Sequence, residues 1–254
     1  ARDGGWAWLA TSRDGAHAPL RRGAALTLAA VVLSFATLGA GALADDFARG
    51  VAVRVAIGPA GALRCDARGR WDVDAAPAAI AALDAAAGGL EFVVHPCATI
   101  TGATRVRRRV EVRIAIDATA DVVGDRVPLH EAADIAVLAC GSLGGARRAL
   151  RVAEACGLPC VVTSGLETSI GLAAGLALAG ALPELPFACE LGTRPLLAGD
   201  LVAVSRSLDP VDGQLPVAPM PPAPQPDLVE RYALTEPGRA ARWRERLRAA
   251  VTAA

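Results

Sequence analysis

From residue 62 onward, short runs of apolar residues recur at regular intervals along the chain. They lie at residues 62–66, 90–94, 112–117, 134–139, 159–164 and 187–192. Their spacing of roughly 22 to 28 residues fits one strand, one helix and two loops per unit. The runs are continuously apolar rather than alternating, which is typical of parallel strands covered on both faces. The pattern therefore predicts a parallel sheet.

Alanine-rich stretches with helical spacing fill the intervals between these runs. We expect helices within residues 75–89, 143–157 and 166–182, with C-caps at the glycine pair beginning at Gly88 and at Gly157. Six such units, with two further strands from the preceding part of the chain, would complete a (β/α)8-type barrel. A doubly wound open sheet is the structural alternative, but no GxGxxG motif follows a first strand to support it.

One segment near the start of the chain raises the question of a membrane span. Residues 24–43 carry no charge and follow Arg21 and Arg22, and a segment of this length could cross a bilayer. Most of its residues are Ala, Gly, Thr and Ser, with few strongly apolar side chains. This composition favours a buried helix followed by a buried strand, and a membrane-tethered protein is kept as an alternative.

The charge composition narrows the possible partners. The chain has 26 basic and 26 acidic residues, so its zero net charge gives no electrostatic reason to expect a nucleic-acid partner. The sequence contains arginine but no lysine, which excludes lysine chemistry within these 254 residues. The basic run at residues 105–109 is interpreted as the exposed face of a helix rather than as a phosphate site.

The six cysteines form neither a CxxC pair nor a cluster with histidine at zinc-ligand spacing. Cys156 and Cys160 lie close together in sequence, on either side of an expected helix-to-strand turn. We expect all six to be small buried hydrophobic residues of a protein in the reducing cytoplasm.

Candidate reactive groups are sought at the carboxyl ends of the strands, where a parallel barrel places its active site. The last residues of five runs are expected to line one mouth of the barrel: Asp66, Val94, Asp117, Ala139 and Ser164. The carboxylates on the first and third of these strands could converge on one Mg²⁺ ion. Each of them could equally serve as a helix N-cap or accept a loop hydrogen bond.

His95 directly follows Val94 at the end of the second of these runs. Because side chains alternate along a strand, we expect His95 to lie on the opposite side from Val94 and to face away from the barrel mouth. A lone histidine at such a position more often packs than binds a ligand.

Several long motifs resemble one known family. They include GGLEFVVHPCAT at residues 88–99, RRRVEVRIAIDAT at 107–119 and the block from AADIAVLACGSLGG to LPELPFAC at 132–189. These segments are similar to those of actinobacterial o-succinylbenzoate synthases of the enolase superfamily, and the resemblance extends over about residues 43–254. It implies a parallel (β/α)-barrel, with the family's N-terminal capping domain missing from this sequence.

The resemblance also implies a reaction. Family members dehydrate 2-succinyl-6-hydroxy-2,4-cyclohexadiene-1-carboxylate to o-succinylbenzoate in menaquinone biosynthesis, and are carbon–oxygen lyases. A lysine on strand two removes the proton α to the carboxylate, and a second lysine on strand six faces the other side of the substrate. Mg²⁺, held by Asp, Glu and Asp on strands three, four and five, stabilises the enediolate. The implied cofactor is therefore magnesium, and the implied ligand is a small-molecule carboxylate.

Carried over residue by residue, the match to the family's reactive groups is incomplete. Asp66 and Asp117 take the first and third metal-ligand positions, whereas Val94 takes the second and Ala139 takes the strand-six lysine position. The strand-two lysine position falls within three residues, Thr37, Leu38 and Gly39. Contacts to the distal part of the substrate fall on Thr163, Ser164 and Gly165.

These observations divide the chain into three expected segments. Residues 1–42 match the family poorly and are either the start of the barrel or a region translated out of frame. Residues 43–210 form the barrel, and residues 211–254 form a proline-rich wrap and a C-terminal helix. We expect a cytoplasmic relative of the o-succinylbenzoate synthases with a degenerate active site. The alternatives are a catalytically inactive barrel with a binding role and a protein tethered to a membrane through residues 24–43.

Overall fold

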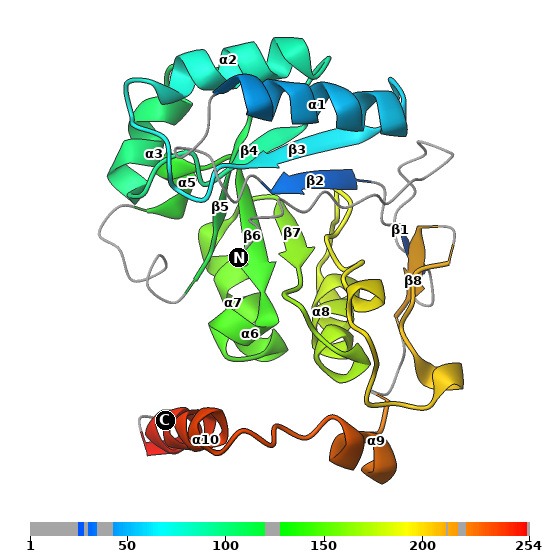
Figure 1. The fold of residues 1–254 in the computed structure, drawn as a ribbon. Helices are drawn as coiled ribbons and strands as arrows, with labels where there is room; N and C mark the ends of the chain where they lie inside the picture. Colours follow the sequence, from blue (N-terminus) through cyan, green and yellow to red (C-terminus); the bar gives the residue numbers. More distant parts are fainter. Residues whose placement is uncertain are drawn as a thin grey trace.

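The computed structural model describes most of the chain from residue 43 onward and two short strands before it (Figure 1). The described residues are 25–27, 30–34, 43–119, 128–211, 213–217 and 222–252. The positions Thr37, Leu38 and Gly39, where the strand-two lysine was expected, lie outside them.

A curled parallel sheet forms the centre of the fold (Figure 1). Its strands are β2 (Ala30–Ser34), β3 (Ala62–Asp66), β4 (Phe92–Val94), β5 (Ile114–Asp117), β6 (Ile135–Ala139) and β7 (Cys160–Thr163). Each strand pairs in parallel with the next one along the chain. This consecutive order is that of a β/α barrel and differs from the doubly wound alternative, in which the strand order reverses.

Helices follow the strands and cover the outside of the sheet, with further short helices and a hairpin toward the C-terminus. The helices are α1 (Leu43–Ile57), α2 (Ala76–Ala86), α3 (Ile100–Arg107), α5 (Leu129–Ala132), α6 (Cys140–Leu143), α7 (Ala146–Cys156), α8 (Ser169–Ala181), η1 (Arg194–Leu196), η2 (Val204–Arg206), α9 (Pro226–Arg231) and α10 (Pro237–Thr252). β8 (Gln214–Pro216) pairs antiparallel with β1 (Ala25–Thr27). As expected, Gly157 caps the C-terminus of α7 with a left-handed backbone, φ of 62°. The other five cysteines are buried but Cys156, the last residue of α7, is partly exposed, so the expectation of six buried cysteines is wrong at Cys156.

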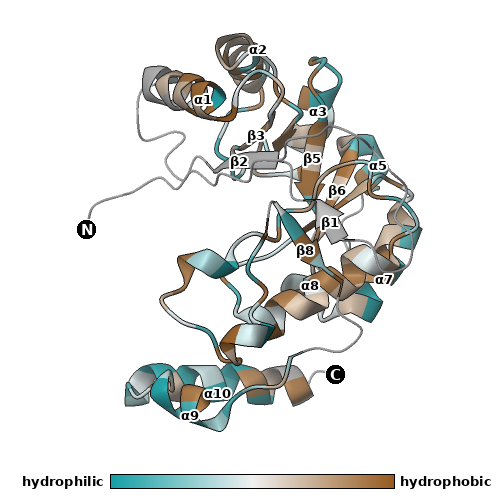
Figure 2. Ribbon diagram, turned by 90° about the vertical axis from the view of Figure 1, so that its right-hand side faces the viewer, coloured by the Kyte–Doolittle hydropathy of each residue, from teal (hydrophilic) through white to brown (hydrophobic). Residues whose placement is uncertain are grey.

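The strands separate two apolar layers because their side chains alternate between faces. Alternate residues such as Leu63 and Cys65 face the helices and join a large buried cluster with them. The other set fills the inside of the curled sheet and consists of Phe92, Val94, Ala115, Ile135, Val137 and Val161, with Phe187 against them. Figure 2 shows the hydrophobic colouring of much of β5 and β6. Burial on both faces explains why the strand sequences are continuously apolar.

One of the six apolar runs does not become a strand. Residues 187–192 make a single parallel bridge, between Thr163 and Glu190, and no named strand forms there. The run is apolar because Cys189 and Leu191 are buried against the helices. Local hydrophobicity therefore predicted the burial of this segment correctly and its strand conformation wrongly.

The segment considered as a membrane span contains strands where it is described. β1 and β2 both lie within residues 24–43, so the helix expected before the strand is replaced by β1 at residues 25–27. No helix within the described ranges is both long and apolar enough to cross a membrane.

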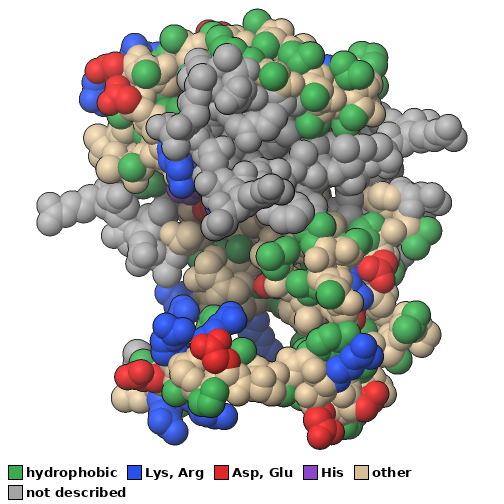
Figure 3. Space-filling model, in the orientation of Figure 1, with side chains coloured by type: hydrophobic (Ala, Val, Ile, Leu, Met, Phe, Trp, Pro, Cys, Tyr) green, Lys and Arg blue, Asp and Glu red, His purple; other side chains and the backbone are tan. Residues whose placement is uncertain are grey.

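The C-terminal helix α10 lies apart from the sheet in both ribbon views (Figures 1 and 2). Its described side chains are mostly exposed, including Trp243 at 57%. Figure 3 shows basic side chains gathered in this lower part of the molecule. The charges of this helix therefore face solvent.

Candidate active site

Two carboxylates lie at the carboxyl ends of β3 and β5, where the mouth of the curled sheet is formed. Asp66 follows the inward-facing Arg64 by two residues, and Asp117 follows Ala115 by two, so both carboxylates belong to the inner face. The backbone N–H of Arg68 donates to Asp66 Oδ1 at 2.9 Å, and Arg68 Nε lies 3.6 Å from Asp66 Oδ2. Asp66 is thereby held at the mouth by the turn that follows β3.

The mouth is electrostatically acidic. Burial, followed by the negative charges of Asp66 and Glu190, raises the pKa of Asp117 to about 7, against the opposing charge of Arg68. Burial also raises the pKa of Asp66, although the Arg68 N–H, the charge of Arg68 and the positive charge that His95 carries when it is protonated oppose the rise. Such a cluster of carboxylates favours a bound proton or cation.

An apolar residue lies between the two carboxylates. Val94 pairs with Asp66 on one side and with Ala115 on the other, and it is only 5% exposed. Mg²⁺ is bound by oxygen ligands in near-octahedral geometry, which an isopropyl group cannot supply. Among the described residues, no group of three or more His, Cys, Asp or Glu side chains is arranged to hold a metal ion. The donor set of the mouth therefore does not fit a complete magnesium site.

His95 lies at the mouth, contrary to the expectation that it faces away. Its φ of 43° is left-handed, so strand alternation stops at Val94 and the side chain turns toward β5. The backbone N–H of Asp117 donates to His95 Nε2 at 2.9 Å, and Nε2 lies 3.6 Å from Asp117 Oδ2. An imidazole that accepts at Nε2 is neutral and carries its proton on Nδ1. Burial lowers the pKa of His95, against the opposing charge of Asp66.

The residues expected to contact the substrate lie at the end of β7. Thr163 is the inward-facing residue there, and its hydroxyl donates to Glu190 Oε2 at 3.1 Å. The Ser164 hydroxyl donates to the Glu190 carbonyl at 3.0 Å and lies 2.9 Å from Thr193 Oγ1. Thr193 in turn donates to the carbonyl of Gly165 at 2.7 Å. These hydroxyls therefore brace the loop beyond β7, and Thr163, rather than Ser164, points into the sheet.

Glu190 is a site residue that the strand pattern did not identify. One of its oxygens accepts from Arg64 Nη1 at 3.0 Å, and the other accepts from Thr163. Arg64 is fully buried and donates from Nε to Glu91 Oε2 at 2.6 Å. The Cζ atom of its guanidinium lies 4.4 Å from the centre of the Phe92 ring. The sequence signal for this ion pair was a charged residue inside each of two apolar runs, Arg64 in residues 62–66 and Glu190 in residues 187–192.

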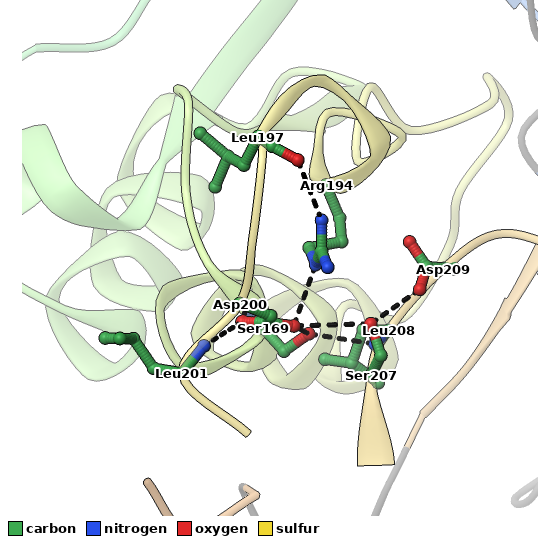
Figure 4. A network of polar contacts seen from close by, with 8 residues as sticks. All are labelled: Ser169, Arg194, Leu197, Asp200, Leu201, Ser207, Leu208 and Asp209. Carbon is green, nitrogen blue, oxygen red and sulfur yellow. Dashed lines mark hydrogen bonds and ion pairs between the residues drawn. The ribbon is translucent and has the colours of Figure 1, made fainter. Parts of the chain in front are cut away.

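A second polar cluster, centred on Asp200, fixes the loop of residues 193–209 that follows the site (Figure 4). Asp200 accepts hydrogen bonds from the N–H and hydroxyl of Ser169, the Nε of Arg194, the N–H of Leu201 and the hydroxyl of Ser207. Burial alone would raise the pKa of Asp200, but the hydrogen bonds from Ser169 and Arg194 outweigh it and lower the pKa to about 2. This carboxylate ties the loop to the first residue of α8.

The expected lysine position on β6 is Ala139, the last residue of that strand. It is paired with Thr163 of β7, is partly exposed and follows the inward-facing Val137 by two residues, so its methyl group belongs to the inner face of the sheet. On the opposite side, the last residue of β2 is Ser34, which is in register with Asp66. The described part of the mouth therefore contains carboxylates, hydroxyls, one neutral imidazole and the guanidinium of Arg68 beside Asp66.

Comparison with known proteins identifies relatives of this chain. The profile of a family described as enolase C-terminal domain-like matches residues 24–224. The o-succinylbenzoate synthase of Thermobifida fusca is 53% identical over 176 residues, which cover 68% of this chain and 54% of that protein. The enzyme of the same name from Mycobacterium leprae is 43% identical over 184 residues, covering 72% and 53%. The chain thus spans about half the length of these relatives.

Solved structures show the same fold. The muconate lactonizing enzyme of Pseudomonas putida superimposes with a TM-score of 0.69 over 80% of this chain and 57% of that one, at 24% identity. The L-Ala-D/L-Glu epimerase of Bacillus subtilis superimposes with a TM-score of 0.62 over 76% and 54%, at 25% identity. The likeness to these enzymes supports the barrel architecture.

Proposed function

Because this chain belongs to the enolase C-terminal domain-like family, we propose that it is an o-succinylbenzoate synthase-type barrel that has lost the dehydration reaction. The observation that carries the proposal is the pair of substitutions at the mouth. Val94 stands at the second metal-ligand position implied by the family and Ala139 at the strand-six lysine position. The sequence of 254 residues contains no lysine elsewhere that could take over the role of the strand-six lysine.

The reaction requires a base beside a weakly acidic C–H bond. A positioned general base contributes typically ~10²–10⁴ to the rate. Arginine cannot act as the base because it stays protonated. The single lone pair of neutral His95, at Nε2, accepts the Asp117 N–H and is not free to take a proton. Asp117, with a pKa near 7, is the described mouth residue best suited to proton transfer.

The reaction also requires stabilisation of the negative charge that develops on the substrate's carboxylate. We propose that Asp66 and Asp117 hold Mg²⁺ only loosely, because two carboxylates leave the ion largely hydrated. Without a bound cation, the charges of these two groups and of Glu190 would repel an anionic substrate and its enediolate. A small-molecule carboxylate remains the ligand that we propose for the mouth, bound weakly and with a cation or proton between the charges.

The test is a spectrophotometric assay of the purified chain with Mg²⁺ and the cyclohexadiene carboxylate. The Thermobifida fusca enzyme serves as the positive control, and we expect the chain to give no rate above buffer. A rate that is abolished by Asp66→Ala and by Asp117→Asn would overturn the proposal. A rate that survives both substitutions would identify a contaminating enzyme and leave the proposal supported.

A gain-of-function variant sharpens the test. Val94→Glu combined with Ala139→Lys restores two of the implied groups, and we expect it to bind Mg²⁺ more tightly but still to give no turnover. The reason is that the strand-two base remains absent from this sequence. Turnover by this double variant would show that the strand-two lysine is dispensable in this barrel.

A further inference from the structure

Helix α10 carries an apolar stripe along one face. Trp243, Leu247 and Val251 follow one another at intervals of four residues, so they lie along the same side of the helix. Their side chains are 57%, 66% and 71% exposed. Both ribbon views place α10 away from the sheet, and Figure 2 shows hydrophobic and hydrophilic residues side by side in it (Figures 1 and 2). The stripe is therefore open to solvent.

The rest of the helix is also exposed. The side chains of residues 241–249 are all exposed, and Ala240 is half-buried. The contacts of its charged groups are local: Arg239 lies 3.9 Å from Glu236, and the Cζ atom of Arg246 lies 4.7 Å from the centre of the Trp243 ring. An isolated helix of about 15 residues is marginal in water and is normally stabilised by packing of its apolar face. The apolar stripe of α10 therefore suits a partner.

Arginines border the stripe on both sides. The sequence reads Arg-Trp-Arg at residues 242–244 and Arg-Leu-Arg at residues 246–248. Successive residues of a helix are about 100° apart around its axis, so the two neighbours of each apolar residue lie on opposite edges of the stripe. On one edge, three arginines and Trp243 line a shallow, open hollow: Arg239, Arg242 and Arg246. The stripe thus has cations along both of its edges.

The positive charge of the chain is concentrated on this helix. α10 contains five arginines and one glutamate, a net charge of +4. Because the whole chain has 26 basic and 26 acidic residues, the rest of it has 21 basic and 25 acidic residues, a net charge of −4. Figure 3 shows the basic side chains gathered in the lower part of the molecule. A partner of α10 should therefore be anionic as well as apolar.

An anionic phospholipid bilayer meets both requirements. Its acyl layer can take up the apolar stripe, its phosphates can be bound by two N–H groups of one guanidinium, and tryptophan is favoured at the boundary between them. A second copy of α10 would instead bring arginine against arginine at both edges. The helix of 16 residues is about 24 Å long, shorter than the hydrocarbon layer of about 30 Å, so it fits the plane of the interface and cannot span the bilayer.

We propose that α10 binds the surface of an anionic phospholipid bilayer. The helix lies in the plane of the interface, with Trp243, Leu247 and Val251 inserted among the lipids and the arginines on the phosphates. This peripheral contact differs from the span considered for residues 24–43. It uses none of the residues of the mouth, so it can be tested independently of the proposed function.

The experiment is flotation of the full chain with lipid vesicles. One set contains phosphatidylcholine and phosphatidylglycerol in equal parts, and the other contains phosphatidylcholine alone. We expect the chain to float with the anionic vesicles only, and to be released at ~1 M salt, where the screening length is about 3 Å. Brominated lipids should quench tryptophan fluorescence, and Trp243→Phe should lose that quenching. Equal flotation with both sets, or flotation with neither, would overturn the proposal.

Paired substitutions separate the stripe from its edges. Arg242→Gln with Arg246→Gln should weaken partition into anionic vesicles at least about tenfold. Arg147→Gln with Arg148→Gln, on the exposed side of α7, removes the same charge and should bind as the unmodified chain does. Trp243→Ala with Leu247→Ala keeps every charge and should also bind about tenfold more weakly. Equal losses in the two arginine pairs would indicate a general charge effect and contradict the proposal.

Two further measurements distinguish other occupants. Glutamine and alanine are good helix formers, so circular dichroism should show that these variants keep the helix. Binding of polyglutamate by a chain that does not float with vesicles would assign the stripe to an acidic protein instead. A dimer in light scattering that Trp243→Ala with Leu247→Ala dissociates, again without flotation, would assign it to a second copy. Either result would refute the assignment to a bilayer.

Discussion

Replacing Asp200 by asparagine removes one charge from the polar cluster that ties the loop to α8. The substitution keeps the shape of the side chain, so its carbonyl oxygen can still accept from the N–H groups of Ser169 and Leu201. Its amide nitrogen would face two donors, the Ser169 hydroxyl and the Arg194 guanidinium, which now contact Asp200 Oδ2 at 2.5 and 2.8 Å. The expected loss of stability therefore has two causes, the removal of the ion pair with Arg194 and the placing of one hydrogen-bond donor against others.

The lowered pKa of Asp200 gives the size of the effect. The folded state lowers this pKa from 3.8 to about 2, and the carboxylate is 5% exposed, so solvent screens it little. At about 1.4 kcal/mol per pKa unit, the ionised carboxylate contributes roughly 2 kcal/mol to the free energy of unfolding. Because the folded pKa lies below the unfolded value, this contribution is present above about pH 4 and is lost as pH falls toward 2.

Urea denaturation followed by circular dichroism measures both the contribution of Asp200 to the free energy of unfolding and its dependence on pH. At pH 7 we expect Asp200→Asn to be less stable than the unmodified chain by roughly 2 kcal/mol, and we expect the difference to shrink as pH falls below about 4. Asp209→Asn is the matched control, because Asp209 is exposed and accepts from Ser207 only at the edge of the cluster. An Asp200→Asn chain as stable as the control at pH 7, or a difference that does not change with pH, would refute the reasoning.

Three further predictions concern the mouth and the inside of the sheet. Val94→Glu should tighten Mg²⁺ binding about tenfold in titration calorimetry, roughly 1.4 kcal/mol, whereas Val94→Gln should not. Asp66→Asn should lower the pKa of Asp117 from about 7 in a carboxyl NMR titration. In the unmodified chain, folding raises the pKa of Asp117, so its ionisation should destabilise the fold as pH rises from about 4 to 7. Arg64→Leu strands two carboxylates and should lower the free energy of unfolding by roughly 3–5 kcal/mol in urea; a loss below 1 kcal/mol would contradict the assigned ion pairs.

The strands and the two carboxylates could be predicted from the sequence because both depend on local periodicity. Five apolar runs became β3 to β7, since a strand buried on both faces must be apolar throughout. Asp66 and Asp117 could then be assigned to one mouth, because parallel strands end at the same edge and alternate residues share a face. The division of the chain at residues 42 and 210, the cytoplasmic location and the substrate contacts stay predictions.

Long-range polar contacts could not be predicted in the same way. Asp200 and Ser169 are 31 positions apart, and Arg64 and Glu190 are 126 apart, so no periodic pattern connects either pair. The run at residues 187–192 has the hydrophobicity of a strand, yet a strand also needs hydrogen-bonding partners along its length. Residues 187–192 form a single bridge, in which the backbone of Glu190 bonds to Val162 and Ser164 on either side of Thr163. The Glu190 side chain pairs with the buried Arg64.

His95 shows how one backbone angle changes the chemistry assigned to a site. Strand alternation correctly places Val94 inside the sheet, and the rule would place His95 outside if β4 continued for one more residue. The left-handed φ of His95 ends the strand, although its N–H still donates to the Ala115 carbonyl at 3.0 Å. The imidazole consequently reaches Asp117 and accepts a hydrogen bond from its backbone N–H. This hydrogen bond occupies the lone pair that a general base would need. His95, which strand alternation placed outside the mouth, thus lies within it and holds the end of β5. The hydrogen bond that it accepts from Asp117, rather than the direction of its side chain, argues against a role in proton abstraction.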